Sequence, residues 1–339
     1  MKTIVSVQEI LELDLKPLPV VAQWRALVEA EIVRRWTNRS AWVHVDWPTC
    51  KQNDAIPAFE RYGIGYVESP TCGSLYAPFR PNEDELWAWS RESAPACFWR
   101  EQMLPASEIV RREKITRPRA DWVLDGIAEY APSAHRLLDV STYGRGLVDL
   151  VATENPRLLE VVAAGMTADL EGISTPRVKV QPTRVADLSA HGQVDVILAV
   201  DVLDRTADLG ALVGAFEQLL APGGVVFATT PVASGFEIQT LWERSPTIIP
   251  PDKLNVPTVE GLQQIFTAPT WEILELSTPG MFDVEMVRRA IEEEPAAPWP
   301  RVVRALVERT DAVGRTALVE LLQARRLAAF ARLVIRKKS

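Results

Sequence analysis

The sequence predicts an α/β protein built on a doubly wound, Rossmann-like sheet. Beyond Asp121, strand and helix patterns alternate, which is typical of a parallel sheet with helices on both faces. Residues 196–200 and 225–228 are continuous apolar runs, too short for helices and suited to strands buried on both faces. Four aspartates add to this evidence, because each lies at or shortly after the end of a predicted strand: Asp139, Asp169, Asp187 and Asp201. The carboxyl edge of such a sheet is where ligands bind.

The elements follow in chain order. Strands are predicted at residues 136–140, 166–170, 178–181, 194–200 and 224–229, with a last strand at 330–336. Helical segments are predicted after the sheet at residues 258–266, 284–294, 301–313 and 315–329. The expected domains are an N-terminal arm and helix (1–45), a small ribbon-like module (46–81), a helical linker (82–120), a cofactor-binding domain (121–235), and a lid with C-terminal helical additions on the substrate side (236–339). The run from Arg111 to Lys114 is interpreted as a solvated helix face.

Composition excludes several classes of function. The chain has 339 residues and 47% hydrophobic content, enough for a sizeable core. Its formal net charge of -8 argues against a nucleic-acid partner, since phosphate binding needs the opposite sign. No apolar run is long enough for a bilayer, and the first residues lack a signal-peptide core, so a cytoplasmic protein without a membrane partner is expected. The three cysteines are too sparse for a disulfide framework.

The module at residues 46–81 has the outline of a zinc ribbon with half of its ligands. Cys50 and Cys72 end two turns, but Trp47 and Ser69 stand where the first cysteine of each pair would be. A structural zinc site needs four ligands, and neither tryptophan nor serine replaces a thiolate. The sequence therefore predicts a ribbon-shaped module without metal, in which an apolar core that includes Trp47 takes the place of the ion.

The turn after the first strand, residues 139–146, carries two glycines, Gly144 and Gly146. A loop that meets a ligand with its backbone needs residues without Cβ. This segment resembles the first strand and cofactor loop of class I S-adenosylmethionine (SAM) methyltransferases, whose pattern is Asp-Val-Gly-x-Gly-x-Gly. Ser141 and Tyr143 occupy the first two glycine positions.

Three further segments carry the resemblance. Residues 194–205 are similar to the family's fourth-strand motif, with Asp204-Arg205 in place of a common Glu-His pair. Pro222-Gly223-Gly224 is similar to its turn into the fifth strand. Residues 249–255 resemble a Pro-Pro-x-His-Leu-Asn segment, with Lys253 at the histidine position, found in the subgroup that has an N-terminal zinc-binding domain and includes sugar C-methyltransferases.

The resemblance implies a SAM site at the carboxyl edge of the sheet. Asp169 would accept hydrogen bonds from the ribose hydroxyls, and Asp187 from the adenine amino group, while Leu170 or Leu188 packs on the ring. Asp201 would lie at the edge of the methyl-donor pocket. The implied cofactor-binding set is Asp139, Tyr143, Gly144, Gly146, Asp169, Leu170, Asp187, Leu188 and Asp201.

The sequence names no catalytic base. Tyr143, Glu237 and Lys253 are the residues whose pKa could be tuned for the task. The expected activity is methyl transfer from SAM to a small molecule, such as a sugar nucleotide or another biosynthetic metabolite. The alternative is a non-catalytic member that serves as a binding or partner subunit, since several expected functional residues are replaced. A nicotinamide oxidoreductase ranks third, because the loop lacks Gly-x-Gly-x-x-Gly. Neither the acceptor nor the oligomeric state is predicted.

Overall fold

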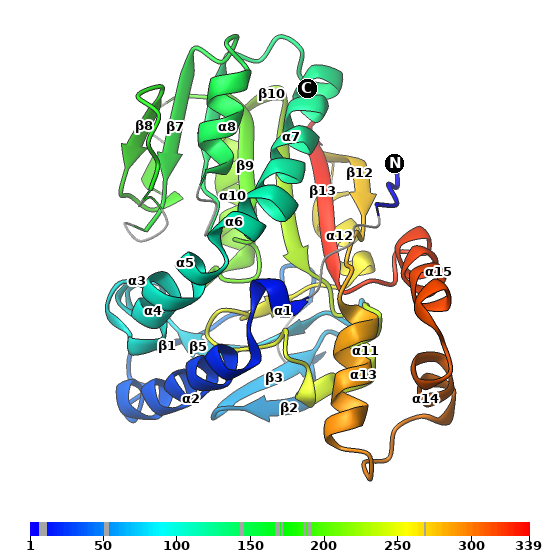
Figure 1. Ribbon diagram of the computed structural model, residues 1–339. Coiled ribbons are helices and arrows are strands. Elements are labelled where there is room, and N and C mark those ends of the chain that lie inside the picture. The colour runs from blue at the N-terminus through cyan, green and yellow to red at the C-terminus, as the bar shows by residue number, and fades with distance from the viewer. Residues whose placement is uncertain are drawn as a thin grey trace.

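A seven-stranded sheet forms the centre of the molecule (Figure 1). The structure is a computed structural model that describes the chain except for residues 7–11, 51–53, 143–145, 167–169, 171, 186, 189–191 and 268. The strand order is β12-β13-β10-β9-β6-β7-β8, and β13 runs antiparallel to both of its neighbours while the remaining pairs are parallel. The strands are β6 (Arg136–Asp139), β7 (Glu160–Ala164), β8 (Val178–Gln181), β9 (Val194–Val200), β10 (Leu220–Pro231), β12 (Trp271–Ser277) and β13 (Phe330–Lys337).

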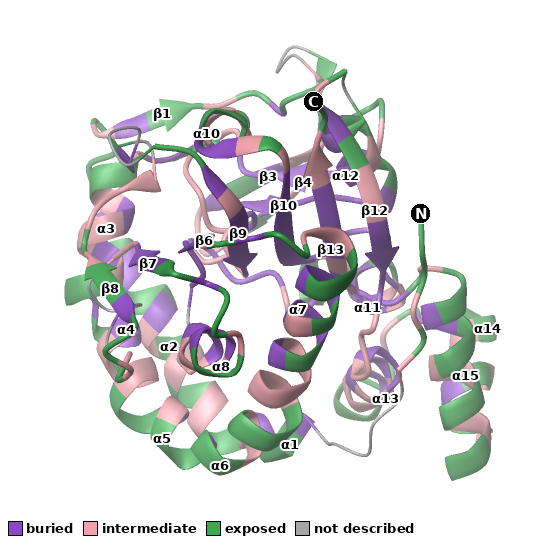
Figure 2. Ribbon diagram, turned by 90° about the horizontal axis from the view of Figure 1, so that it is seen from above, coloured by how far each residue is buried: buried purple, intermediate pink, exposed green. Residues whose placement is uncertain are grey.

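Helices cover both faces of this sheet, which confirms the doubly wound α/β prediction. On one face, α7 (Arg117–Tyr130) and α8 (Leu147–Glu154) pack on Leu137, Leu198 and Phe227. On the other, α10 (Leu209–Leu219) and α12 (Val259–Phe266) pack on alternate residues of the same strands, such as Leu138 and Ile197. Because successive side chains of a strand point to opposite faces, both faces of the central strands are buried (Figure 2).

One predicted strand was wrong in position and another was missed. The second strand is Glu160–Ala164 instead of residues 166–170, and it ends at Gly165, whose φ of +153° few other residues adopt. Val161 to Ala164 are all buried, so the apolar run at 161–164 marks the strand. Strand β12 was missed because Glu272 and Glu275 interrupt its apolar pattern.

The N-terminal part adds a small second sheet below the first. Its four strands have the order β11-β4-β3-β2, and a separate antiparallel pair joins β1 to β5. Strand β11 comes from the lid region and pairs with β4 through Asn255 and Val256. The module therefore includes a strand from beyond residue 235. These elements are α1 (Glu12–Leu15), α2 (Leu18–Arg35), β1 (Trp42–His44), β2 (Ile56–Arg61), β3 (Ile64–Glu68), β4 (Leu75–Tyr76), β5 (Phe79–Pro81) and β11 (Asn255–Val256).

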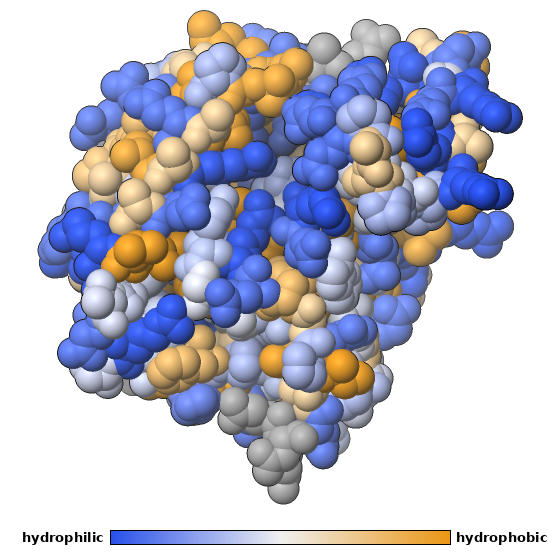
Figure 3. Space-filling model, turned by 90° about the horizontal axis from the view of Figure 1, so that it is seen from below, coloured by the Kyte–Doolittle hydropathy of each residue, from blue (hydrophilic) through white to orange (hydrophobic). Residues whose placement is uncertain are grey.

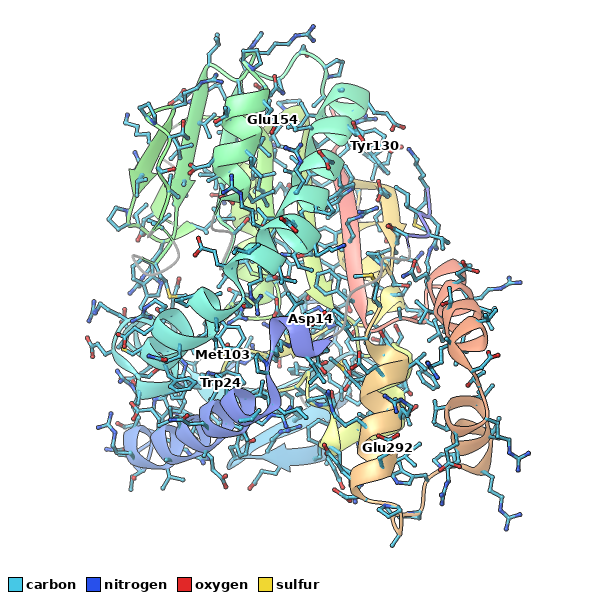
Figure 4. The ribbon with its side chains drawn as sticks, viewed as in Figure 1. Asp14, Trp24, Met103, Tyr130, Glu154 and Glu292 are labelled. Carbon is cyan, nitrogen blue, oxygen red and sulfur yellow. The ribbon has the colours of Figure 1, made fainter. Side chains whose placement is uncertain are left out.

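A broken helical path connects this module to the central sheet. Short helical pieces follow one another from residue 83 to α7, and Trp24 of α2 and Met103 mark where α2 meets them in Figure 4. The pieces are α3 (Glu83–Glu92), α4 (Ala94–Phe98), η2 (Trp99–Met103), α5 (Leu104–Ala106), α6 (Glu108–Arg111) and η3 (Arg112–Thr116). This path brings residues from several short segments to the same side of the sheet.

The C-terminal region is helical apart from its two strands. α11 (Phe236–Leu241) and the short η5 (Trp242–Arg244) follow β10, and α13 (Asp283–Glu293) packs against α11. α14 (Arg301–Glu308) and α15 (Ala312–Ala324) lie at the side of the molecule in Figure 1. The face seen from below mixes hydrophilic and apolar side chains (Figure 3). Of the helices in the described ranges, none combines the length and apolarity that crossing a bilayer requires.

Candidate functional site

A cavity of about 1290 Å³ opens at the carboxyl edge of the sheet. Gly146 after β6, Ser174 after β7 and Asp201 after β9 line one part of it. The lid, the start of α13, α7 and the segment of α1 and α2 line other parts of it. Strand ends thus meet residues from both ends of the chain in one space, as expected for a ligand site in a doubly wound sheet.

Gly146 begins α8 and has a φ of +79°, in the left-handed region that favours glycine. It is the predicted cofactor-loop residue that the structure describes in the cavity wall. In the first turn of α8, Asp149 accepts hydrogen bonds from the backbone N–H of Ser174 at 2.9 Å and from its hydroxyl at 2.8 Å. This contact fixes the segment after β7 next to the start of α8. Tyr143, Gly144 and Asp169 lie outside the described residues.

Asp139 is buried at the end of β6, and its Oδ1 accepts a hydrogen bond from the backbone N–H of Ser141 at 2.9 Å. Burial raises the pKa of Asp139 to about 6, against the lowering effect of Ser141. Ser141 itself is buried, and its hydroxyl accepts a hydrogen bond from the backbone N–H of Val200 at 3.1 Å. The serine at the first glycine position therefore ties the start of the loop to β9.

Asp201 follows β9 with a φ of +54°, a conformation that aspartate tolerates better than most residues. Its Oδ1 accepts a hydrogen bond from the Thr229 hydroxyl at 2.7 Å, and its Oδ2 lies 3.3 Å from Nη1 of Arg119. Burial favours a higher pKa for Asp201, but the positive charges of Arg119 and Lys253 outweigh it and lower the pKa below its usual range. A carboxylate and a guanidinium thus lie side by side in the cavity wall.

The other predicted adenine contacts lie elsewhere among the described residues. Leu170 is buried in the core between the sheet, α7 and α8, and Leu188 in the core on the opposite face. Asp187 is exposed. Asp139, Leu170, Asp187 and Leu188 are all absent from the cavity lining that the structure describes. Leu170 is not at the end of the second strand, because that strand ends at Ala164.

The lid, residues 242–257, is held by two ion pairs to the loop after β9. Lys253 donates a hydrogen bond to Oδ2 of Asp204, whose side chain is fully buried. The Nη1 of Arg205 lies 2.8 Å from Oδ2 of Asp252. The backbone N–H of Leu254 also donates to the carbonyl of Asp204 at 2.8 Å. Lys253 and Asp204, which occupy the positions of an expected histidine and glutamate, therefore contact each other.

A second anchor joins the lid to the N-terminal module. Asn255 donates from Nδ2 to the carbonyls of Leu203 and Thr206, and its Oδ1 accepts a hydrogen bond from Nη1 of Arg80 at 2.7 Å. Arg80 is fully buried, and burial lowers its pKa to about 10. The Tyr66 hydroxyl donates to the carbonyl of Lys253 at 2.8 Å. The N-terminal module therefore contacts the lid directly.

Glu237 in α11 is a buried acid in the cavity wall. Burial raises its pKa to about 7, while the nearby hydroxyl of Ser245 opposes the shift. Neither carboxyl oxygen has a partner with full hydrogen-bond geometry in the described chain. Its neighbour Asp283 differs, because Oδ1 accepts hydrogen bonds from the backbone N–H groups of Ala329 at 2.7 Å and Glu237 at 3.3 Å.

The half-ribbon has an apolar centre. Trp47 is buried, with its ring 5.7 Å from that of Tyr76, and Cys50 and Cys72 pack on the same core cluster. Ser69 is buried, and its hydroxyl lies 3.0 Å from that of Thr71. Throughout the ranges that the structure describes, no three His, Cys, Asp or Glu side chains gather as metal ligands would. Trp47 fills the volume between the two turns, as its size and apolarity predict.

Sequence patterns missed the basic residues of the cavity. Lys16, Arg25, Arg111 and Arg119 all line it. The interpretation of the run at Arg111 as a solvated face fits the exposed residues 112–114, whereas Arg111 is partly buried. The sequence did hold a sign of these residues, because Arg25 and Arg111 lie among apolar residues with helical spacing. Periodicity alone, however, does not show on which face of a helix a cavity opens.

Residues 111–276 match a family model described as a methyltransferase domain. This part of the chain is therefore similar to methyltransferase domains. Its strand order and the antiparallel β13 agree with this match. A search of curated proteins found no significant match.

Several solved structures are similar at low identity. An O-methyltransferase from a polyketide synthase multienzyme of Brevibacillus brevis, in complex with S-adenosyl-L-homocysteine (SAH), has 15% identity over 69% of this chain and 77% of its own, with a TM-score of 0.46. The plantazolicin methyltransferase in complex with SAH has 12% identity over 75% and 94%, with a TM-score of 0.45. A putative sarcosine dimethylglycine methyltransferase from Galdieria sulphuraria has 14% identity over 67% and 88%, with a TM-score of 0.42. At this level of similarity no residue role or substrate carries over to this chain.

The donor set at the strand ends fits SAM chemically. The amino-acid end of SAM is zwitterionic, and the cavity offers the carboxylate of Asp201 beside the guanidinium of Arg119. Gly146 lets a ligand approach the backbone at the start of α8. Opposite charges and an open backbone are the features that this cofactor requires.

Proposed function

We propose that the protein is a SAM-dependent methyltransferase that acts on a small molecule bound in the cavity. The observation that carries the proposal is the meeting of Gly146, Asp201 and Arg119 in one cavity at the carboxyl edge of a class I methyltransferase sheet. When bound, SAM would supply an electrophilic methyl group on its sulfonium. Asp201 would face the amino group of the cofactor, and Arg119 its carboxylate.

The contribution of the chain to the reaction is mainly alignment. Methyl transfer from a sulfonium is an in-line displacement, so a bound acceptor gains most from being held in the reactive geometry. The lid, anchored by Lys253 and Asn255 to the loop after β9, contributes to the cavity wall. Its fixed position would exclude water and hold the acceptor against the donor.

Glu237 is the best candidate for removing a proton from the acceptor. Lys253 is engaged by Asp204, and Tyr143 lies outside the described residues. Burial gives Glu237 a pKa of about 7, which suits a base at neutral pH. Its buried carboxyl oxygens lack full hydrogen bonds in the described chain, so they would accept one from a polar acceptor group that reaches the wall.

The acceptor belongs to small-molecule metabolism in this proposal. A sugar nucleotide is one candidate, because of the resemblance of residues 249–255 and of the half-ribbon to the sugar C-methyltransferase subgroup. Other biosynthetic metabolites of similar size fit the cavity volume of about 1290 Å³ equally well, since cofactor and acceptor must share it.

The second candidate is a binding or partner subunit with no turnover. The observation in its favour is that Asp204 and Lys253, at two positions of expected functional residues, satisfy each other in an ion pair. Such a pair stabilises the lid and leaves neither group free for chemistry. In this case the fold would be retained for binding.

Incubation with SAM and a panel of candidate acceptors separates the two functions. The readout is SAH formation by mass spectrometry, with protein omitted in one control and acceptor in another. The enzyme proposal predicts acceptor-dependent SAH and a methylated product. If SAH binds but no acceptor in the panel is methylated, the subunit candidate is favoured; if neither SAM nor SAH binds, the proposed function is wrong.

A further inference from the structure

Three cations in the cavity have few negative partners. Lys16 follows α1, Arg25 lies in α2, and Arg111 ends α6, so they come from three separate segments that meet in the cavity wall. In the described parts of the chain, no carboxylate lies within 4.0 Å of the charged groups of Arg25 or Arg111. The amine of Lys16 lies 3.9 Å from Oε1 of Glu12, whose Oε2 accepts a hydrogen bond from Arg289.

Lys16 lies near enough to the two arginines to be affected by their charge. Burial lowers the pKa of Lys16 most, and the positive charges of Arg111, Lys253 and Arg25 lower it further, although Glu12 opposes them. The side chain of Lys16 nevertheless keeps 37% of its surface accessible, which is consistent with a group that borders an open cavity. Gathering like charges costs free energy, and a chain with a net charge of -8 has many carboxylates that could have relieved it.

Arg25 and Arg111 differ in how they are held. Arg111 donates from Nε to the Ser107 hydroxyl at 2.7 Å and from Nη2 to the carbonyl of Leu15 at 3.1 Å, so part of its role is structural. The Nε of Arg25 is buried and has no hydrogen-bond partner in the described chain. An unmet buried donor on a guanidinium is costly unless a ligand supplies the acceptor.

The cluster reaches from the N-terminal module to the donor side of the cavity. Arg61 and Tyr62 of the module act on Arg25, together with Glu12 and Arg289, whereas Arg119 and Asp201 of the donor side act on Arg111. Next to the cluster, the rings of Trp24 and Trp99 lie 5.1 Å apart and also line the cavity. Asp14 and Trp24 in Figure 4 show where α1 and α2 lie relative to the sheet.

We infer that Lys16, Arg25 and Arg111 bind an anionic group, a phosphate or a carboxylate, of the methyl acceptor. Guanidinium and ammonium groups from separate segments are well suited to such groups, since both provide charged hydrogen-bond donors. The aromatic pair then contacts the less polar part of the same molecule. This inference names the acceptor class of the proposed function and rests on it.

Calorimetric titrations of the full chain with pyrophosphate and with citrate, at constant ionic strength, test the inference. The wild type is expected to bind at least one of the two probes, and preference for one distinguishes phosphate from carboxylate chemistry. Arg25→Gln is expected to weaken that binding by about tenfold or more. Arg34→Gln is the matched control, because Arg34 lies on the same helix with 68% of its side chain exposed.

A parallel titration with SAH separates this inference from the proposed function. Arg25→Gln should bind SAH as the wild type does, which also shows that the variant is folded. Absence of probe binding by the wild type, or equal binding by wild type and Arg25→Gln, would overturn the anion site. An equal loss in Arg34→Gln would overturn it too, because it indicates non-specific charge attraction. If the wild type binds a probe but does not bind SAH, the proposed function is refuted while the anion site is supported.

Discussion

Lys253 donates a hydrogen bond to the buried carboxylate of Asp204, which joins the lid to the loop after β9. The two residues are 49 positions apart in the chain. Each stands where the related methyltransferase motifs have another residue, so the replacements form one interacting pair. The pair explains how the lid remains in place when the expected glutamate and histidine are absent.

Breaking this pair should destabilise the protein. In Lys253→Met, the carboxylate of Asp204 stays buried without its main counter-charge, and loss of one partner of a buried pair costs about 3 kcal/mol. The variant with both Lys253→Met and Asp204→Asn should lose less than the sum of the single changes, since no charge remains stranded. Urea unfolding measures all three. Additive losses would show that the two side chains do not interact.

Ser141 should stabilise the cofactor loop through its hydroxyl. Ser141→Ala removes the acceptor of the Val200 N–H, and the expected loss is about 1 kcal/mol in the free energy of unfolding. Ser141→Gly should cost somewhat more, because glycine adds backbone freedom to the unfolded chain. Thermal or urea unfolding checks this order. A Ser141→Gly variant more stable than the wild type would contradict the role assigned to the hydroxyl.

Arg119 should contribute to cofactor binding. Arg119→Gln removes the cation beside Asp201, and SAH affinity is expected to fall about tenfold, or about 1.4 kcal/mol. Arg117→Gln is the control, because Arg117 lies on the same helix but pairs with Asp121 and Glu154 at the surface. Calorimetry with SAH compares the two. Equal affinities in both variants would remove Arg119 from the cofactor site.

Glu237 should make stability fall as pH rises. Its pKa in the folded protein is raised from 4.5 to about 7, so its stabilising contribution is complete below pH 4.5 and is lost as pH rises towards 7. Asp139 and Asp283, both with a pKa raised to about 6, act in the same direction. Glu237→Gln should flatten the profile and be more stable than the wild type at pH 8, by up to about 3 kcal/mol.

Unfolding measured between pH 4.5 and 8 tests this prediction. Glu243→Gln serves as the control, because 54% of its side chain is exposed and its removal should leave the profile unchanged. The same Glu237→Gln protein tests the proposed base, since it should bind SAH normally while methyl transfer falls. If Glu237→Gln has the same stability profile as the wild type, Glu237 is not a buried acid with a raised pKa.

The sequence predicted the fold because buried parallel strands leave continuous apolar runs, as at β9 and β10. It misplaced the second strand, whose buried apolar run lies at residues 161–164. Gly146 and Asp201 were predicted in the site and line the cavity, since Asp201 directly follows β9 and Gly146 caps the helix after β6. Arg25 and Arg111 were not predicted, because their common location depends on how α2 and α6 pack, which periodicity does not encode.

Calorimetric titration of the chain with SAH tests whether the cavity at the strand ends is a cofactor site. Saturable binding of one equivalent is expected, weakened by Arg119→Gln and unaffected by Arg117→Gln. Absence of binding at high micromolar SAH would contradict it, because the cavity at Gly146, Asp201 and Arg119 would then not be a cofactor site.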